Sequence, residues 1–205
     1  MAATFKQLCD FFSEVGADDV QHSDKSYLAH AIGVYNDLKS WGCDEELSRV
    51  GLFHSIYGTE MFQGFKLSCD RRDDVRDLVG ERTERISYYN CAMDRAHFDR
   101  QVPVELESYH LLDRFTGVEI PIANQDFHDL CVVHLCDWLE QVERSANWDY
   151  RRDEFRNLAF RLGGIAMESY NRVFSIAPAQ AMSAQATSAQ ATSAQATSAQ
   201  ATSAQ

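Results

Sequence analysis

The sequence contains no long, uncharged apolar segment. No window holds the roughly 18 apolar residues that a membrane-spanning helix needs, and the first residues, MAATFKQLCDFFSEVG, lack the apolar run of a secretory signal. We therefore expect a protein that is neither inserted in a membrane nor secreted, and that has no membrane partner.

Basic residues are also scarce. The chain has 19 Lys and Arg residues against 31 Asp and Glu residues, which gives a formal net charge of -12 at pH 7. Such a charge repels the phosphate backbone that dominates the affinity of proteins for nucleic acids. The charge balance therefore argues against DNA and RNA as partners.

Closely paired cysteines are missing as well. The six cysteines include no C-x-x-C pair, and they are spread along a chain that is too long to depend on disulfides. The spacing excludes a zinc ribbon. We interpret all six as small buried hydrophobic residues with reduced thiols, which indicates a cytoplasmic location.

The composition indicates one globular domain followed by a low-complexity tail. Apolar residues make up 45% of the 205 residues, enough for a substantial core. From residue 186 the chain consists of four copies of ATSAQ, preceded by near-copies that begin at residue 176. A repeat of five matches neither a helix nor a strand, so we predict a folded domain over residues 1–175 and a disordered tail over residues 176–205. A spacer or glycosylated stalk is the alternative to a repeat expansion without function.

Apolar residues recur at helical spacing through most of the domain. The pattern predicts a mainly α protein, a single bundle of about six to seven helices, because the period fails only between residues 97 and 123. Within that gap, two apolar stretches flank Thr116-Gly117 and predict a minor β-hairpin near residues 108–122. The second helix should begin after Ser23 or Asp24. The expected helices cover residues 5–15, 25–41, 44–54, 70–79, 81–96, 124–142 and 151–168.

Three polar residues lie on the apolar faces of different predicted helices: His30, His54 and Asp137. A buried, unpaired carboxylate is costly, but a divalent cation held with two imidazoles would neutralise it. The alternative is that each histidine is hydrogen-bonded in the core and that Asp137 pairs with an arginine or reaches solvent. Spacing alone favours this alternative.

Two segments resemble the HD-domain superfamily of metal-dependent phosphohydrolases. The stretch YLAHAIGVYNDLKSWGCDEELSRVGLFHS is similar to the helix pair that opens this fold, with His30 and His54 at the two histidine positions, and HLCDWLEQ is similar to the later helix that supplies an aspartate. The resemblance implies an HD-like helical bundle in which His30, His54 and Asp137 hold a divalent metal ion, which would be manganese, iron or zinc.

A closer resemblance is to an uncharacterised branch of HD-like proteins in which His-Ser replaces His-Asp. It rests on HSDKSYLAHAIGVY, GLFHSIYGTEMF and DRRDDVRDLVGERTERISYYN. Ser55 stands where the superfamily has an aspartate that ligates metal and can bridge two ions, so we expect one ion and not two.

The departure at Ser55 leaves two catalytic candidates, Ser55 itself and Glu60. Glu60 can replace the lost carboxylate as a base or ligand if the segment YGTE turns back toward the site; a helix cap or an exposed position is the alternative. The other candidates would hold a small anionic substrate, although arginines in such arrays more often form ion pairs on a solvated helix face. These substrate-binding candidates are His22, Tyr57, Arg82 and Arg85.

The sequence therefore predicts an HD-like metal-dependent enzyme that hydrolyses a small phosphorylated or anionic molecule through one divalent ion. Two alternatives stay open. One is a catalytically inactive HD-like module that binds a small molecule or a protein. The other is a mononuclear non-haem iron oxygenase, because two histidines and one carboxylate are the ligand set of that class.

Overall fold

The computed structural model describes residues 3–17, 20–22, 25–145 and 147–178. Over these ranges the chain is mainly helical, with nine α-helices and two small antiparallel strand pairs, so the predicted fold class is confirmed. The elements are α1 (Phe5–Glu14), β1 (Gln21–His22), β2 (Lys25–Ser26), α2 (Tyr27–Ser40), α3 (Glu45–Phe53), a 3₁₀ turn (Cys69–Arg71), α4 (Arg72–Val79), α5 (Glu81–Ala92), α6 (Arg95–Gln101), β3 (Tyr109–Asp113), β4 (Val118–Ile122), α7 (Asn124–Ser145), α8 (Arg152–Leu162) and α9 (Gly164–Phe174).

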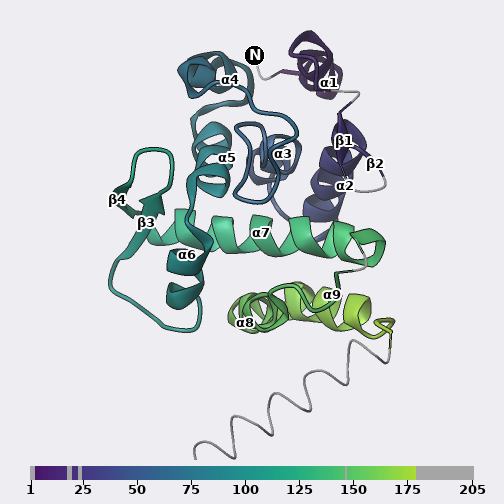
Figure 1. Cartoon of the computed structure of the whole chain (residues 1–205), viewed down its shortest axis with the longest axis vertical. Coiled ribbons are helices and arrows are strands. Elements are labelled where there is room, and N and C mark those ends of the chain that lie inside the picture. The colour runs from purple at the N-terminus through teal and green to yellow at the C-terminus, as the bar shows by residue number, and fades with distance from the viewer. Residues whose placement is uncertain (1–2, 18–19, 23–24, 146, 179–205) are drawn as a thin grey trace, which may run out of the picture.

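The longest helix, α7, runs through the middle of the molecule (Figure 1). Helices α2, α3 and α5 pack along one side of it, and α8 and α9 pack on the other side. Because both sides are covered, most residues between Asp126 and Val142 are buried. Several polar residues of α7 in this stretch, Asp137 among them, are therefore buried in the protein interior.

Helices α2 and α3 approach each other unusually closely at Gly51. A Cβ atom at this position would lie 2.6 Å from the backbone nitrogen of Tyr35, so no larger residue fits without a shift of one helix. The caps fix where both helices begin: the Ser26 side chain accepts a hydrogen bond from the Ala29 amide, and Asp44 accepts one from the Leu47 amide. The cap of α2 is therefore Ser26 and not Ser23 or Asp24, which the sequence suggested and which fall outside the described residues.

Two helices depart from the expected pattern. Helix α6 lies where no helix was predicted; it has only seven residues, too few for a periodic signal, and it is fixed by Asp94 as N-cap and by the packing of Phe98. The helix expected over residues 151–168 is two helices, because Gly163 and Gly164 adopt positive φ values of 63° and 42° and break it. These departures raise the helix count of the described residues above the expected six to seven.

The predicted hairpin is present as β3 and β4, which pair antiparallel with Tyr109 opposite Ile122. One buried apolar cluster extends from Leu8 in α1 to Ala177 beyond α9. Among the described residues, no helix is long and apolar enough to cross a membrane. Nearly all of the predicted tail, residues 179–205, lies outside the described residues.

Candidate metal centre

His30 projects from α2 into the interior and is fully buried. Its Nδ1 lies 2.5 Å from Oε2 of Glu140, a carboxylate of α7 that also accepts hydrogen bonds from Lys25 and Arg144. Burial would raise the pKa of Glu140, but the bond with His30 and the neighbouring cations outweigh it and hold this pKa at about 2. Glu140 is therefore ionised and accepts a hydrogen bond from Nδ1–H of His30, and the Nε2 atom of His30 faces the cluster.

His54 follows directly after α3 and is 1% exposed. Its Nδ1 lies 2.8 Å from the carbonyl oxygen of Gly51. A carbonyl can only accept, so Nδ1 donates, and in the neutral form of the ring the lone pair lies on Nε2. The His54 carbonyl in turn accepts a hydrogen bond from Asn90 of α5, which fixes the backbone at this position.

The structure brings His30, His54 and Asp137 together. The two Nε2 atoms are 3.3 Å apart, and Oδ1 of Asp137 lies 3.0 Å from Nε2 of His30 and 3.4 Å from Nε2 of His54. Ligands about 2.1 Å from one ion are separated by about 3.0 Å at right angles and about 3.4 Å at the tetrahedral angle. The three atoms therefore have the spacing of ligands around a single metal ion.

The charge of the cluster fits a cation as well. Burial would raise the pKa of Asp137, but the two histidines outweigh it and hold this pKa well below its usual value. Burial lowers the pKa of His30, yet its hydrogen bonds with Asp137 and Glu140 raise it to about 9. Two carboxylates thus favour positive charge on His30, and a divalent ion bound to Nε2 can take the place of the extra proton.

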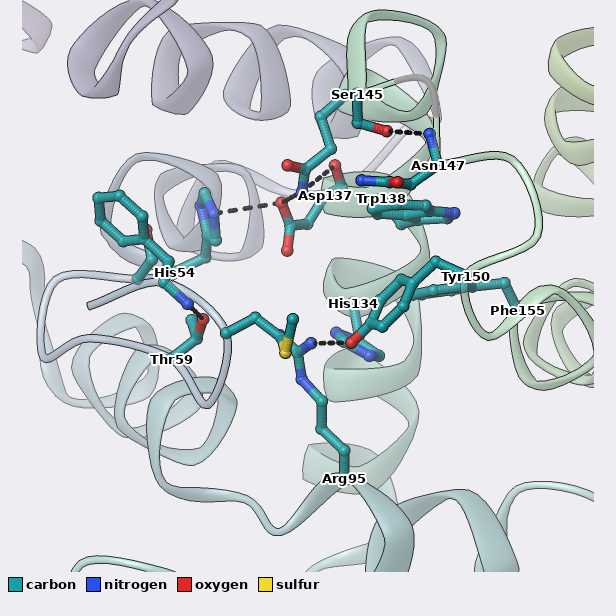
Figure 2. Close-up of a pocket in the computed structure, with 14 residues that line it drawn as sticks. His54, Thr59, Arg95, His134, Asp137, Trp138, Ser145, Asn147, Tyr150 and Phe155 are labelled. Carbon is teal, nitrogen blue, oxygen red and sulfur yellow. Dashed lines mark hydrogen bonds and ion pairs between the residues drawn. The ribbon is translucent and has the colours of Figure 1, made fainter. Parts of the chain in front are cut away.

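A cavity of about 320 Å³ opens beside the cluster. His54 and Asp137 form one part of its wall, and the aromatic rings of Trp138 and Tyr150 form another (Figure 2). Gln141 donates a hydrogen bond of 2.9 Å to Oδ1 of Asp137, which orients the carboxylate. The full lining is His54, Ser55, Thr59, Met61, Phe62, Arg95, His134, Asp137, Trp138, Gln141, Ser145, Asn147, Tyr150 and Phe155.

His134 lies one turn before Asp137 and contributes to the same wall. Its Nε2 is 3.0 Å from the Arg151 guanidinium, which can only donate, so the ring is neutral and Nδ1 carries its proton. Burial, helped by the charges of Arg151 and Arg95, holds the pKa of His134 well below its usual value. The ring that faces the cavity here is therefore uncharged.

Ser55 is buried and lines the cavity next to His54. Its hydroxyl donates a hydrogen bond of 3.3 Å to the hydroxyl of Tyr27. Ser55 is not one of the three clustered ligand residues. The structure thus places it in the wall of the site, where it supplies a neutral polar group.

The structure does not bring the predicted substrate-binding arginines to this cavity. Arg82 pairs with Asp129 at 2.8 Å and with Asp44 at 2.6 Å, and Arg85 pairs with Asp126 at 2.9 Å. Each guanidinium joins α5 to α7, and that of Arg82 also reaches the start of α3. The sequence could not distinguish substrate binding from ion pairing between helices for these two arginines, because their acidic partners lie 38 to 47 positions away.

Glu60 and Tyr57 also lie outside the cavity lining. The exposed Glu60 carboxylate accepts a hydrogen bond from the backbone amide of Arg95 and so caps the start of α6. The Tyr57 hydroxyl instead donates to the buried carboxylate of Glu84. His22 belongs to β1, but its side chain falls outside the described part of the chain.

The sequence analysis missed several residues of the site. Trp138 and Gln141 share a helix face with Asp137, so the spacing of α7 was a usable signal for them. Glu140 was detectable only as an acid within a predicted buried helix. Arg95 and Tyr150 follow short or irregular segments, and no pattern in the sequence pointed to them.

Comparison with known proteins adds one finding. A family model described as "Domain of unknown function (DUF6817)" matches residues 11–95, a range that includes His30 and His54 but not Asp137. No curated protein matches the chain. No solved structure matches it.

Proposed function

We propose that this protein is an HD-like metal-dependent enzyme that hydrolyses a small phosphorylated or anionic molecule with one divalent ion. One observation carries the proposal: Nε2 of His30, Nε2 of His54 and Oδ1 of Asp137 lie 3.0 to 3.4 Å apart. The resemblance to the HD superfamily, carried by the same three residues, supports the hydrolytic chemistry.

The surrounding residues have defined tasks in this proposal. Glu140 and the Gly51 carbonyl hold the two imidazoles with Nε2 inward, and Gln141 holds the Asp137 carboxylate. A divalent cation, when bound, polarises an anionic substrate and lowers the pKa of a water molecule. Asp137 is the only carboxylate in the described cavity lining, which supports one ion in place of two.

A mononuclear iron oxygenase is the second candidate. Two imidazoles and one carboxylate, with no fourth protein ligand in the described cluster, are the set that leaves coordination positions open in non-haem iron oxygenases. Ser55, a neutral residue where the HD superfamily has a carboxylate, favours this candidate. The third candidate is an inactive binding module.

The metal content of the purified full chain tests the proposal. We expect about one manganese or zinc per chain after expression in metal-replete medium, and phosphate release from a panel of small phosphomonoesters. Asp137→Asn should lose most of the metal because it removes the only anionic ligand, whereas His128→Ala, on an exposed position of the same helix, should keep it.

Other outcomes separate the three candidates. One iron per chain, with substrate-dependent oxygen consumption and no phosphate release, would favour the oxygenase. Less than about a tenth of an ion per chain would leave only the binding module.

A further inference from the structure

Arg95 is a cation of the cavity wall that forms no ion pair with a carboxylate of the described residues. Its guanidinium donates one hydrogen bond of 2.7 Å, from Nη1 to the Tyr150 hydroxyl, and no acidic side chain of the described residues pairs with it. Glu60 lies close in space, but its carboxylate accepts a hydrogen bond from the backbone amide of Arg95 and not from its side chain. The remaining N–H groups of a guanidinium suit a bidentate oxyanion.

Other partly buried arginines of the protein use more of their N–H groups. Arg82 has Asp129 at 2.8 Å, whereas Arg114 and Arg161 form no ion pair among the described residues but each donate at least two hydrogen bonds to backbone carbonyl or hydroxyl oxygens. A partly buried guanidinium is costly to leave without partners. The single hydrogen bond of Arg95 to the described residues therefore leaves N–H groups available for an oxyanion from outside the chain.

The wall next to Arg95 is flat and aromatic. The rings of Trp138 and Phe155 stack with centroids 5.2 Å apart and planes at 10°, and the Tyr150 ring lies 5.1 Å from Trp138 (Figure 2). Such a wall suits a flat unsaturated group.

The charge of the lining residues and the volume of the cavity further limit the class of ligand that it can bind. Asp137 is the only acid of the described lining and Arg95 its only Arg or Lys residue, so any cation bound by the cluster makes the cavity positive. The volume of about 320 Å³ is twice that of a cavity, about 150 Å³, that holds a benzene molecule. It therefore fits one six-membered ring with a short anionic substituent.

We propose that the cavity binds a small molecule in which a carboxylate or phosphoryl group pairs with Arg95 and a single flat ring lies along Trp138 and Phe155. The inference deepens the proposed function, because on that function this molecule is the substrate or product. The recognition by Arg95 and the aromatic wall does not itself require the metal.

Calorimetric titration of the full chain with benzoate and phenylphosphonate tests this recognition, with and without manganese. We expect dissociation constants near 1 mM, the value for about ten heavy atoms at an ordinary ligand efficiency. The two probes distinguish a carboxylate from a phosphoryl ligand. Benzamide, acetate and inorganic phosphate, which lack the charge or the ring, should bind at least tenfold more weakly.

Variants assign the binding to Arg95. Arg95→Gln should weaken binding of the preferred probe at least tenfold, and Arg95→Lys should weaken it less, while Arg100→Gln, at an exposed position of the same helix, should leave it unchanged. The inference is overturned if Arg95→Gln binds like the original protein, if benzamide binds as tightly as benzoate, or if neither anion shows saturable binding at ten times the expected constant.

The two proposals fail separately in this experiment. If the protein takes up no metal but binds the anion in a way that depends on Arg95, the anion-binding proposal is supported and the proposed hydrolase function is contradicted. If the protein takes up metal and releases phosphate, Arg95→Gln leaves both unchanged, and neither anion binds, the hydrolase function is supported and the anion-binding proposal is contradicted.

Discussion

Each histidine of the cluster is oriented by an acceptor at its Nδ1 atom. For His54 the acceptor is the neutral carbonyl of Gly51, whereas for His30 it is the ionised carboxylate of Glu140. A carboxylate partner fixes the ring and increases the basicity of the opposite nitrogen. His30 should therefore be the stronger of the two imidazole ligands, and Glu140 should control its strength.

We predict that Glu140→Gln weakens divalent-metal binding by about 10- to 100-fold. The amide keeps the shape of the side chain but loses the charge that holds His30, Lys25 and Arg144. Competition with a chromogenic chelator measures the affinity. Glu143→Gln, an exposed position on the same helix, serves as the control and should bind metal normally. Equal affinities in the two variants would show that Glu140 does not support the site.

At the scale of elements, the contact between α2 and α3 sets the distance between the two histidines. His30 lies near the start of α2 and His54 at the end of α3, so the helices must run close together for their Nε2 atoms to lie 3.3 Å apart. The absent side chain of Gly51 permits this approach. A glycine inside a helix is otherwise unfavourable, which points to packing as its role.

We predict that Gly51→Ala lowers the free energy of unfolding by about 1–3 kcal/mol, because its Cβ would overlap the backbone of Tyr35. At an unconstrained helical position the same change would stabilise the protein by about 0.5–1 kcal/mol, so the sign is diagnostic. Urea unfolding measures it. Asn36→Ala, an exposed change on α2, should stay within about 0.5 kcal/mol of the original protein.

Displacement of α3 should also separate His54 from His30. Metal affinity of Gly51→Ala should therefore fall together with stability. A variant with higher stability and unchanged metal affinity would contradict the close approach of the two helices.

Helix α6 shows how a short element places a functional side chain. The Asp94 side chain caps the helix by accepting a hydrogen bond from the His97 amide, and Glu60 accepts one from the Arg95 amide. These two contacts fix the first turn, from which the Arg95 side chain reaches Tyr150 across the cavity. Glu60, a catalytic candidate in the sequence, thus supports the position of a residue that lines the site.

On the scale of the whole molecule, α7 joins the two halves of the site. It carries Asp137, which meets the histidines of α2 and α3, and Trp138, which packs on Phe155 of α8. The cavity is lined by members of both, with His54 and Asp137 on one side and the aromatic wall on the other (Figure 2). Among the described residues, Ala177 is the last member of the buried core cluster.

We predict that a chain ending at Ala177 melts within roughly 4 °C of the full chain, which corresponds to a change of about 1 kcal/mol at most. The ATSAQ repeats carry no charge and no apolar stripe that could pack on the domain, and Pro178 discourages a longer α9. Differential scanning calorimetry of both chains provides the comparison. A larger fall would mean that residues beyond 177 contribute to the folded domain.

The sequence by itself determined the features that depend on local periodicity. A buried helical face shows as apolar residues at a spacing of 3.6, and a polar residue within such a face is visible without a structure, which is how His30, His54 and Asp137 stood out. Their assignment to one site came from the resemblance to the HD-domain superfamily. The β3–β4 hairpin was visible from a different local signal, because two short apolar stretches flank a turn that contains Gly117. Helix α6 is too short to show a periodic pattern of apolar residues, and the break at Gly163 did not interrupt the pattern enough to be predicted.

The tertiary structure alone decided which polar residues meet. Glu140 reaches His30 across 110 positions and Arg95 reaches Tyr150 across 55, while Arg82 is bound by Asp129 and is held away from the cavity. Local sequence shows that a side chain is charged, but the pairing of charges depends on how separate helices pack against one another. The orientation of the three candidate metal ligands and the presence of Arg95 in the cavity wall therefore became visible only in the folded chain.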